Sequence, residues 1–181
     1  RLKTRCIARY LAQGKSETCV FNLGIGGENT DSLRRRFSSE LAARLDADER
    51  LFVLLAYGAN DAALVAGSHV VPLERFLDNL RYCTAETLRF KGTPLLLTIT
   101  PVARAADGIV NRNGRLRSNG TISRYNDALR GAAAGMGAVV LDAHAEFMKH
   151  DLETLFVPDG VHPNTAGHEV LYELADRRFG S

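Results

Sequence analysis

The sequence has few of the features that mark proteins that bind nucleic acid or cross a membrane. Its 181 residues carry a formal net charge of only +2, and basic residues do not alternate with aromatic ones as they do on nucleic-acid platforms. The apolar runs LFVLLA and PLLLTI are far shorter than the roughly 20 residues that a transmembrane helix needs. Nothing at the start resembles a signal peptide. We therefore expect no nucleic-acid partner and no membrane span.

Cysteine is also scarce. The three cysteines, Cys6, Cys19 and Cys83, are widely separated and do not form the close pairs typical of a zinc site. Helical patterns surround Cys6 and Cys83 and a strand pattern surrounds Cys19, so all three are predicted to be buried thiols. Free thiols favour a reducing, cytoplasmic compartment, although an export signal upstream of Arg1 would leave no trace in these residues.

Hydrophobic residues make up 45% of the chain and charged residues 24%, which suits one domain over residues 1–181 with a full core. Apolar periodicity predicts helices over 2–13, 30–45, 72–90, 122–136 and 163–179, separated by the strands ETCVFNL, RLFVLLA, TPLLLTIT and GAVVLDA. Thr30 is the predicted N-cap of the second helix, and Pro163 is expected in the first turn of the last one. This alternation predicts an α/β fold with a parallel sheet that is covered on both faces.

A twenty-residue stretch, 101–120, interrupts this alternation. It carries Arg104, Arg112, Arg115 and Arg117. Its length suggests either a lid or wall beside a substrate or a solvated, mobile loop, and the sequence favours neither.

Three polar or glycine-rich segments are expected at the carboxyl ends of strands or just before the last helix, namely NLGIGGENT, YGANDA and VPDGVHPNTAGH. In open parallel sheets the loops at these ends meet in a crevice where ligands bind. Asn60 in YGANDA is by itself an ordinary turn former, and its convergence with the other segments is what favours a functional role.

Asp159 and His162 are three positions apart in DGVHP. This spacing allows a carboxylate to hold one imidazole nitrogen and leave the other free as a general base. The alternatives are that Asp159 caps the turn and His162 faces solvent, or that both residues join His168 in a metal site, which no second ligand cluster supports.

GIGGEN lacks the glycine order of a dinucleotide fingerprint and the Lys-Ser/Thr ending of a P-loop, so no cofactor is predicted. Its glycines permit a tight turn that exposes backbone N–H groups. Such donors, together with an asparagine amide, can form an oxyanion hole.

Taken in order, NLGIGGENT, YGAND and DGVHP resemble three of the four motif blocks of the SGNH hydrolases, also called the GDSL esterase/lipase family. The resemblance implies a flavodoxin-like three-layer α/β/α fold and hydrolysis of esters through an acyl-enzyme. It assigns the backbone N–H of Gly27 and the side-chain amide of Asn60 to the oxyanion hole. It makes His162 the general base and Asp159 the residue that orients it.

The family's nucleophile is the serine of a Gly-Asp-Ser block after the first strand, and this sequence contains neither that block nor a strand before its first predicted helix. Seven of its serines stand in helix, turn or loop contexts that differ from the block: Ser16, Ser32, Ser38, Ser39, Ser68, Ser118 and Ser123. In the family this strand lies inside the sheet, and its loss would leave two neighbouring strands without backbone partners. We therefore expect the natural protein to extend upstream of Arg1, with an apolar strand that ends in Gly-Asp-Ser.

The sequence thus predicts a serine esterase that acts on small or carbohydrate-linked acyl esters, acetyl esters among them, without metal or cofactor. A lysophospholipase or thioesterase that uses the same site is the alternative within enzymes. The alternative from another class is a binding domain that keeps the fold and pocket but lacks the serine.

Overall fold

The computed structural model of the chain describes residues 19–45 and 50–179. Its main sheet contains β1 (Phe52–Leu55), β4 (Thr93–Leu97) and β6 (Val139–Leu141), all parallel, in the order β1-β4-β6. Leu54 pairs with Leu95, and Leu95 in turn pairs with Val139. The central strand β4 is covered on both faces, because successive residues point to opposite sides of a sheet and both Leu95 and Leu96 are fully buried.

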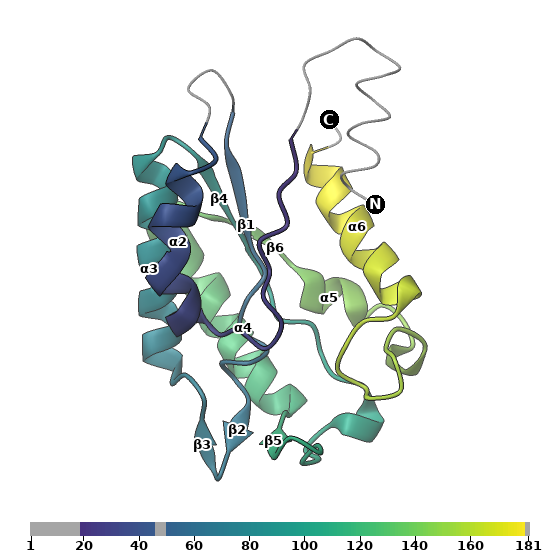
Figure 1. The fold of residues 1–181 in the computed structure, drawn as a ribbon. Helices are drawn as coiled ribbons and strands as arrows, with labels where there is room; N and C mark the ends of the chain where they lie inside the picture. The colour runs from purple at the N-terminus through teal and green to yellow at the C-terminus, as the bar shows by residue number, and fades with distance from the viewer. Residues whose placement is uncertain (1–18, 46–49, 180–181) are drawn as a thin grey trace.

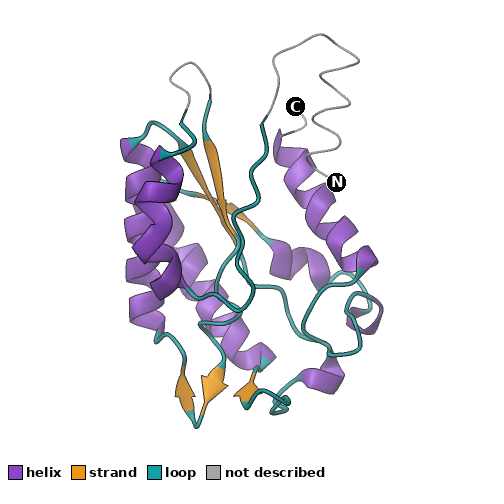
Figure 2. Ribbon diagram, viewed as in Figure 1, coloured by secondary structure: helices purple, strands orange, loops and turns teal. Residues whose placement is uncertain are grey.

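Helices cover both faces of this sheet (Figure 1, Figure 2). On one side lie α2 (Thr30–Ala42), α3 (Leu73–Arg89) and α4 (Asn119–Ala133), and on the other lie α5 (Ala143–Phe147) and α6 (Thr165–Phe179). The first group builds the larger core, to which α2 contributes Leu33, Phe37 and Leu41 at four-residue spacing. In the smaller core Phe147 packs with Leu155 and Phe156 under α6. The predicted α/β class, with a parallel sheet between helical layers, is confirmed.

The helix starts differ slightly from those predicted. Asn29, not Thr30, is the N-cap of α2, because its Oδ1 accepts the N–H of Ser32 at 3.1 Å. Asn164 caps α6 in the same way, accepting the N–H groups of Ala166 and Gly167, so Pro163 precedes the helix. In both cases an asparagine one residue away is the acceptor that the free backbone N–H groups reach.

Four further predictions need correction. The described part of ETCVFNL, residues 19–23, forms no strand, and its Cys19 is exposed, whereas Cys83 is buried as predicted. Leu54 in RLFVLLA is 39% exposed, and β1 pairs with β4 along one edge while no described strand pairs with its other edge. Leu45 lies beyond the end of α2 and is partly exposed. The predicted helix over 2–13, with Cys6, and Ser16 lie outside the described residues.

The stretch 101–120 is a hydrogen-bonded hairpin rather than an irregular loop. After a 3-10 turn (Arg104–Ala106), the N–H of Gly108 donates to the carbonyl of Arg117 at 2.8 Å. Its strand β5 (Arg115–Leu116) joins β2 (Leu64–Val65) and β3 (Ser68–His69) in a small antiparallel sheet of order β3-β2-β5. The side chain of Asn119 fixes the start of the hairpin, because it bonds both the N–H and the carbonyl of Val102.

Two further 3-10 turns complete the described elements, Ala134–Met136 after α4 and Leu152–Thr154 before the last loop. None of the helices in residues 19–45 and 50–179 is long and apolar enough to cross a membrane.

Candidate active site

Asp159 and His162 occupy one short loop between the 3-10 turn at 152–154 and α6. The bridge between Phe156 and Pro163 closes this loop, and the N–H of Val157 donates to the carbonyl of His162 at 2.9 Å. A side chain on Gly160 would collide with Ala106, since its Cβ would lie 2.7 Å from the Cβ of that residue. The loop is therefore held by its own backbone and packed against the 101–120 hairpin.

The carboxylate of Asp159 faces the imidazole of His162. Its Oδ2 lies 2.6 Å from Nδ1 of His162, and its Oδ1 accepts the N–H groups of Val161 and His162 at 2.8 and 3.0 Å. Although partial desolvation opposes it, the two backbone donors and the imidazole lower the pKa of Asp159 to about 2. A carboxylate that is ionised at neutral pH favours the tautomer of His162 with its proton on Nδ1.

This arrangement leaves Nε2 of His162 available. The side chain of His162 is 77% exposed, and no group in the described part of the chain hydrogen-bonds Nε2. A neutral imidazole with a free Nε2 lone pair can accept a proton from a hydroxyl group, which is the task of a general base. The geometry described by the turn alternative is also present, since Asp159 caps the loop and His162 faces solvent.

Asn60 lies in the turn that follows β1, in which the N–H of Ala62 donates to the carbonyl of Gly58. Its side chain is half-buried and reaches across to the loop that precedes α2, where Nδ2 donates to the carbonyl of Glu28 at 2.9 Å. Asn60 is therefore a turn residue, as predicted, and its side chain also contacts another segment of the chain. The structure thus brings Asn60 next to the residue that follows Gly27.

Gly27 is exposed, with φ at +76°. No acceptor for its N–H lies among the described residues, and an added Cβ would meet nothing within 4 Å. Glycine is therefore required here by the backbone conformation and not by close packing. A free N–H beside an asparagine amide fits the predicted pair of donors.

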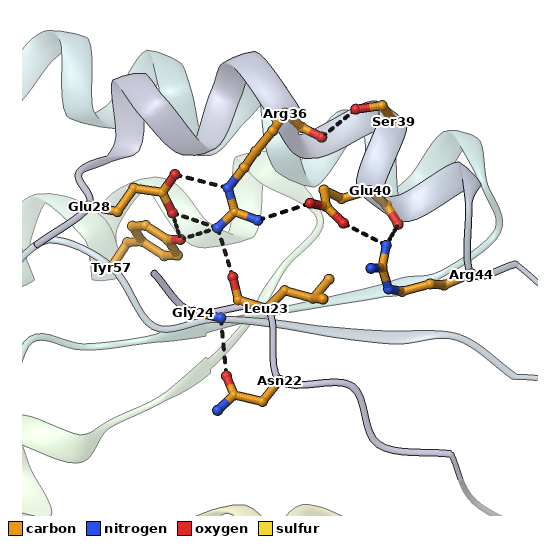
Figure 3. A network of polar contacts seen from close by, with 9 residues as sticks. All are labelled: Asn22, Leu23, Gly24, Glu28, Arg36, Ser39, Glu40, Arg44 and Tyr57. Carbon is orange, nitrogen blue, oxygen red and sulfur yellow. Dashed lines mark hydrogen bonds and ion pairs between the residues drawn. The ribbon is translucent and has the colours of Figure 1, made fainter. Parts of the chain in front are cut away.

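A partly buried polar network holds Leu23 and Glu28, on either side of Gly27 in the chain (Figure 3). Arg36 of α2 donates from Nε and Nη2 to the carboxylate of Glu28 at 2.9 and 2.5 Å, and Nη2 also reaches the carbonyl of Leu23. The hydroxyl of Tyr57, just after β1, donates to the same carboxylate at 2.5 Å. Burial and the negative charge of Glu28 raise the pKa of Tyr57, and the hydrogen bonds from Arg36 lower that of Glu28. The network therefore ties the loop to both α2 and β1.

Asp61, next to Asn60, stabilises the start of α2 through hydrogen bonds from Thr30. It is fully buried, and its Oδ1 accepts both the N–H and the hydroxyl of Thr30. Its Oδ2 has no hydrogen-bond partner among the described residues, and burial raises the pKa of this carboxyl.

Two arginines of the 101–120 hairpin complete the surroundings of Asn60. Arg115 and Arg117 both donate to its Oδ1, at 3.0 and 2.8 Å. The guanidinium of Arg117 also interacts electrostatically with the carboxylate of Asp159. This side chain therefore links the region around Asn60 to the Asp159 loop. The arginines are evident in the sequence but their contact with Asn60 is not, because the pairing of β5 with β2 leaves no periodic pattern.

The described residues contain no serine that hydrogen-bonds His162. Ser118, the serine next to Arg117, caps α4 by accepting the N–H of Thr121. The same residues contain no group of three His, Cys, Asp or Glu side chains that could hold a metal ion, so Asp159, His162 and His168 do not form such a cluster.

The architecture is a three-layer α/β/α fold, and the sequence identifies the family. The GDSL-like Lipase/Acylhydrolase family matches over residues 2–170, so the chain belongs to this family of hydrolases. The resemblance seen in the motif blocks is thereby confirmed.

Curated relatives cover most of the chain at low identity. An uncharacterized lipoprotein, YqeF, of Bacillus subtilis strain 168 is 25% identical over 85% of this chain and 70% of its own length. An isoamyl acetate-hydrolyzing esterase 1 homolog of Homo sapiens is 27% identical over 84% of this chain. The match spans 65% of that human protein, so this chain corresponds to about two thirds of it.

Solved structures share the fold. The acetylxylan esterase Axe2 of Geobacillus stearothermophilus superposes with a TM-score of 0.72 at 23% identity, over 98% of this chain and 80% of its own. LAE5, an alpha/beta hydrolase enzyme from the metagenome of Lake Arreo, gives a TM-score of 0.73 at 21% identity, over the same shares. At these identities the comparison establishes the fold.

Proposed function

We propose that this protein is a serine esterase that hydrolyses small or carbohydrate-linked acyl esters, acetyl esters in particular, through an acyl-enzyme. The observation that carries the proposal is the contact of 2.6 Å between Asp159 and His162, with Nε2 of His162 free and exposed. The names of two similar proteins, an acetylxylan esterase and an isoamyl acetate-hydrolyzing esterase homolog, support acetyl esters as the substrate class. Variants of the acetylxylan esterase described as catalytic mutants replace a serine, an aspartate and a histidine.

In the proposed reaction a serine hydroxyl attacks the ester carbonyl while Nε2 of His162 takes its proton. The carbonyl oxygen becomes an oxyanion that accepts hydrogen bonds from the N–H of Gly27 and the amide of Asn60. Collapse of this intermediate breaks the bond to the alcohol, which leaves with the proton from Nε2. Water then attacks the acyl-serine by the same route, giving the free acid and the free serine.

We propose that the nucleophilic serine lies outside the described residues, on a strand that pairs with the open edge of β1. Beside this edge runs a groove of about 590 Å³, lined by residues of β1, α6 and the segment that precedes Gly24, among them Asn22, Leu54 and Leu171. In Figure 1 this segment passes alongside β1. A strand in the groove would cover the exposed side chain of Leu54 and end at the same edge as Asn60.

A fluorophosphonate probe tests the proposal on the natural full-length protein, followed by peptide mapping of the adduct. We expect one labelled serine outside residues 19–45 and 50–179, and loss of labelling in His162→Ala. A label on a described serine would overturn the assignment of the nucleophile. A folded protein that takes up no probe and hydrolyses no ester would replace the enzyme with a binding domain.

The choice of substrate needs a second experiment, because a lysophospholipase or thioesterase could use the same dyad. Rates on p-nitrophenyl esters from acetate to palmitate, on an acyl thioester and on acetylated xylo-oligosaccharides separate these activities. We expect the highest kcat/KM on acetyl esters. A maximum at long chains or on the thioester would favour the alternative.

A further inference from the structure

The side-chain amide of Asn60 is held from two sides. Its Oδ1 accepts hydrogen bonds from Nη1 of Arg115 at 3.0 Å and Nη2 of Arg117 at 2.8 Å. Its Nδ2 donates to the carbonyl of Glu28 at 2.9 Å. Three contacts from two separate segments, the 101–120 hairpin and the loop before α2, therefore converge on one short side chain.

These contacts allow only one orientation of the amide. A guanidinium has only donors and a backbone carbonyl only accepts, so Oδ1 must face the arginines and Nδ2 must face Glu28. A flipped amide would point its NH2 group at two cations and its oxygen at a carbonyl. Only one of the two hydrogens on Nδ2 is used by Glu28, and the other has no acceptor in the described residues.

The hairpin holds both arginines where they are. Arg115 is part of β5 and pairs with Val65 of β2, and Nε of Arg117 donates to the carbonyl of Ala59 at 3.0 Å. Both side chains are bonded to neutral oxygens, and neither forms an ion pair with a described carboxylate. Burial and the nearby charge of Arg115 lower the pKa of Arg117.

We propose that Arg115 and Arg117 are positioning residues that hold the amide of Asn60 as an oxyanion donor and polarise it; this inference rests on the proposed esterase function. Two cationic donors on Oδ1 draw electron density from the amide nitrogen and strengthen its remaining N–H as a donor. The benefit grows as negative charge develops on the substrate oxygen, so it lowers the barrier to reaction more than it tightens substrate binding.

The test is a double-mutant cycle on the full-length protein. Replacing both arginines by alanine should lower kcat on an aryl acetate by a factor on the order of 10 to 10², with KM changed less than about threefold. In an Asn60→Ala background the same two replacements should have almost no further effect, because the residue through which they act is gone. Equal losses in both backgrounds, or a loss confined to KM, would overturn the proposal.

Arg112→Ala is the matched control, because Arg112 is exposed on the same hairpin and its side chain has no hydrogen bond or ion pair in the described residues. It should keep wild-type kcat. Arg117→Lys should recover part of the loss, since it keeps the charge but not the two-pronged contact with Ala59 and Asn60. Full recovery by lysine together with a comparable loss in Arg112→Ala would point to nonspecific electrostatics and overturn the proposal.

A measurement that needs no activity separates this inference from the esterase proposal. The side-chain NH2 resonances of Asn60, assigned by their absence in Asn60→Ala, should shift in the double arginine variant and stay in place in Arg112→Ala. Unchanged resonances would refute the positioning role even in an active enzyme. If the Asn60 resonances shift in a protein that hydrolyses no ester, the positioning role of the arginines stands and only the esterase proposal is refuted.

Discussion

Nδ1 of His162 and Oδ2 of Asp159 are 2.6 Å apart on a single loop, and the same carboxylate caps that loop through the N–H of His162. The residue that orients the imidazole is therefore also the residue that shapes the turn carrying it. Because the contact lies within one short segment, it does not depend on how distant parts of the chain pack.

His162→Ala should lower kcat for ester hydrolysis by a factor on the order of 10³ to 10⁴, because the serine would lose its general base. Asp159→Asn should cost less, on the order of 10², since the asparagine oxygen can still cap the loop but the ionised partner of Nδ1 is lost. His150→Ala is the control, because His150 is exposed and its side chain has no hydrogen bond in the described residues. A His162 variant that keeps more than a tenth of wild-type kcat at neutral pH would contradict the assignment.

Asp142 should make stability depend on pH in the acid range. Desolvation raises the pKa of this carboxyl, but hydrogen bonds from Arg130, Ala145 and Thr98 outweigh it and lower the pKa to about 2. The folded pKa lies below the unfolded value of 3.8, so the stabilisation is complete above that value and is lost as pH falls towards 2.

Urea unfolding at pH 7, 5, 4 and 3 measures this effect. Asp142→Asn keeps the N-cap of α5 and should flatten the decline in unfolding free energy between pH 4 and pH 3. Asp127→Asn is the matched control, because Asp127 pairs with the same Arg130 but is 75% exposed. Parallel curves for wild type and Asp142→Asn would show that another carboxyl controls acid stability.

Gly58→Ala should destabilise the fold through both backbone and packing. Gly58 has φ at +121°, and an added Cβ would lie 2.6 Å from Cγ1 and Cδ1 of Ile99. We expect a loss of about 2 to 4 kcal/mol in the free energy of unfolding. Gly67→Ala, with φ at +80° and open space around it, should lose only about 1 kcal/mol. Equal losses at the two positions would show that the contact with Ile99 relaxes freely.

The two described thiols should differ in reactivity. Burial raises the pKa of Cys83 to about 12, whereas Cys19 is exposed. A maleimide at pH 7.5 should label Cys19 in the native protein and Cys83 only in urea, because the reactive species is an accessible thiolate. Peptide mass spectrometry identifies each site. Rapid native labelling of Cys83 would mean that α3 opens from the core.

The sequence by itself determined most of the described helices and strands and the contact between Asp159 and His162. Apolar runs of strand length alternating with helical periodicity specified the α/β class, and α2, α3 and β4 formed within a few residues of their predicted ranges. The spacing of Asp159 and His162 was enough for their contact, because three residues on a tight loop leave the side chains little freedom. The glycine at position 27 could be interpreted from the sequence for the same local reason, because it has a backbone conformation that other residues avoid.

Only the tertiary structure decided what surrounds Asn60. Arg115 and Arg117 reach it because β5 pairs with β2 some fifty residues away in sequence, and such pairing leaves no periodic mark in the chain. The exposure of Cys19 and Leu54 could likewise not be predicted from their apolar runs, because the burial of a side chain depends on which distant segments pack around it. Local geometry follows from short stretches of sequence, whereas contacts between distant segments depend on how the whole domain packs.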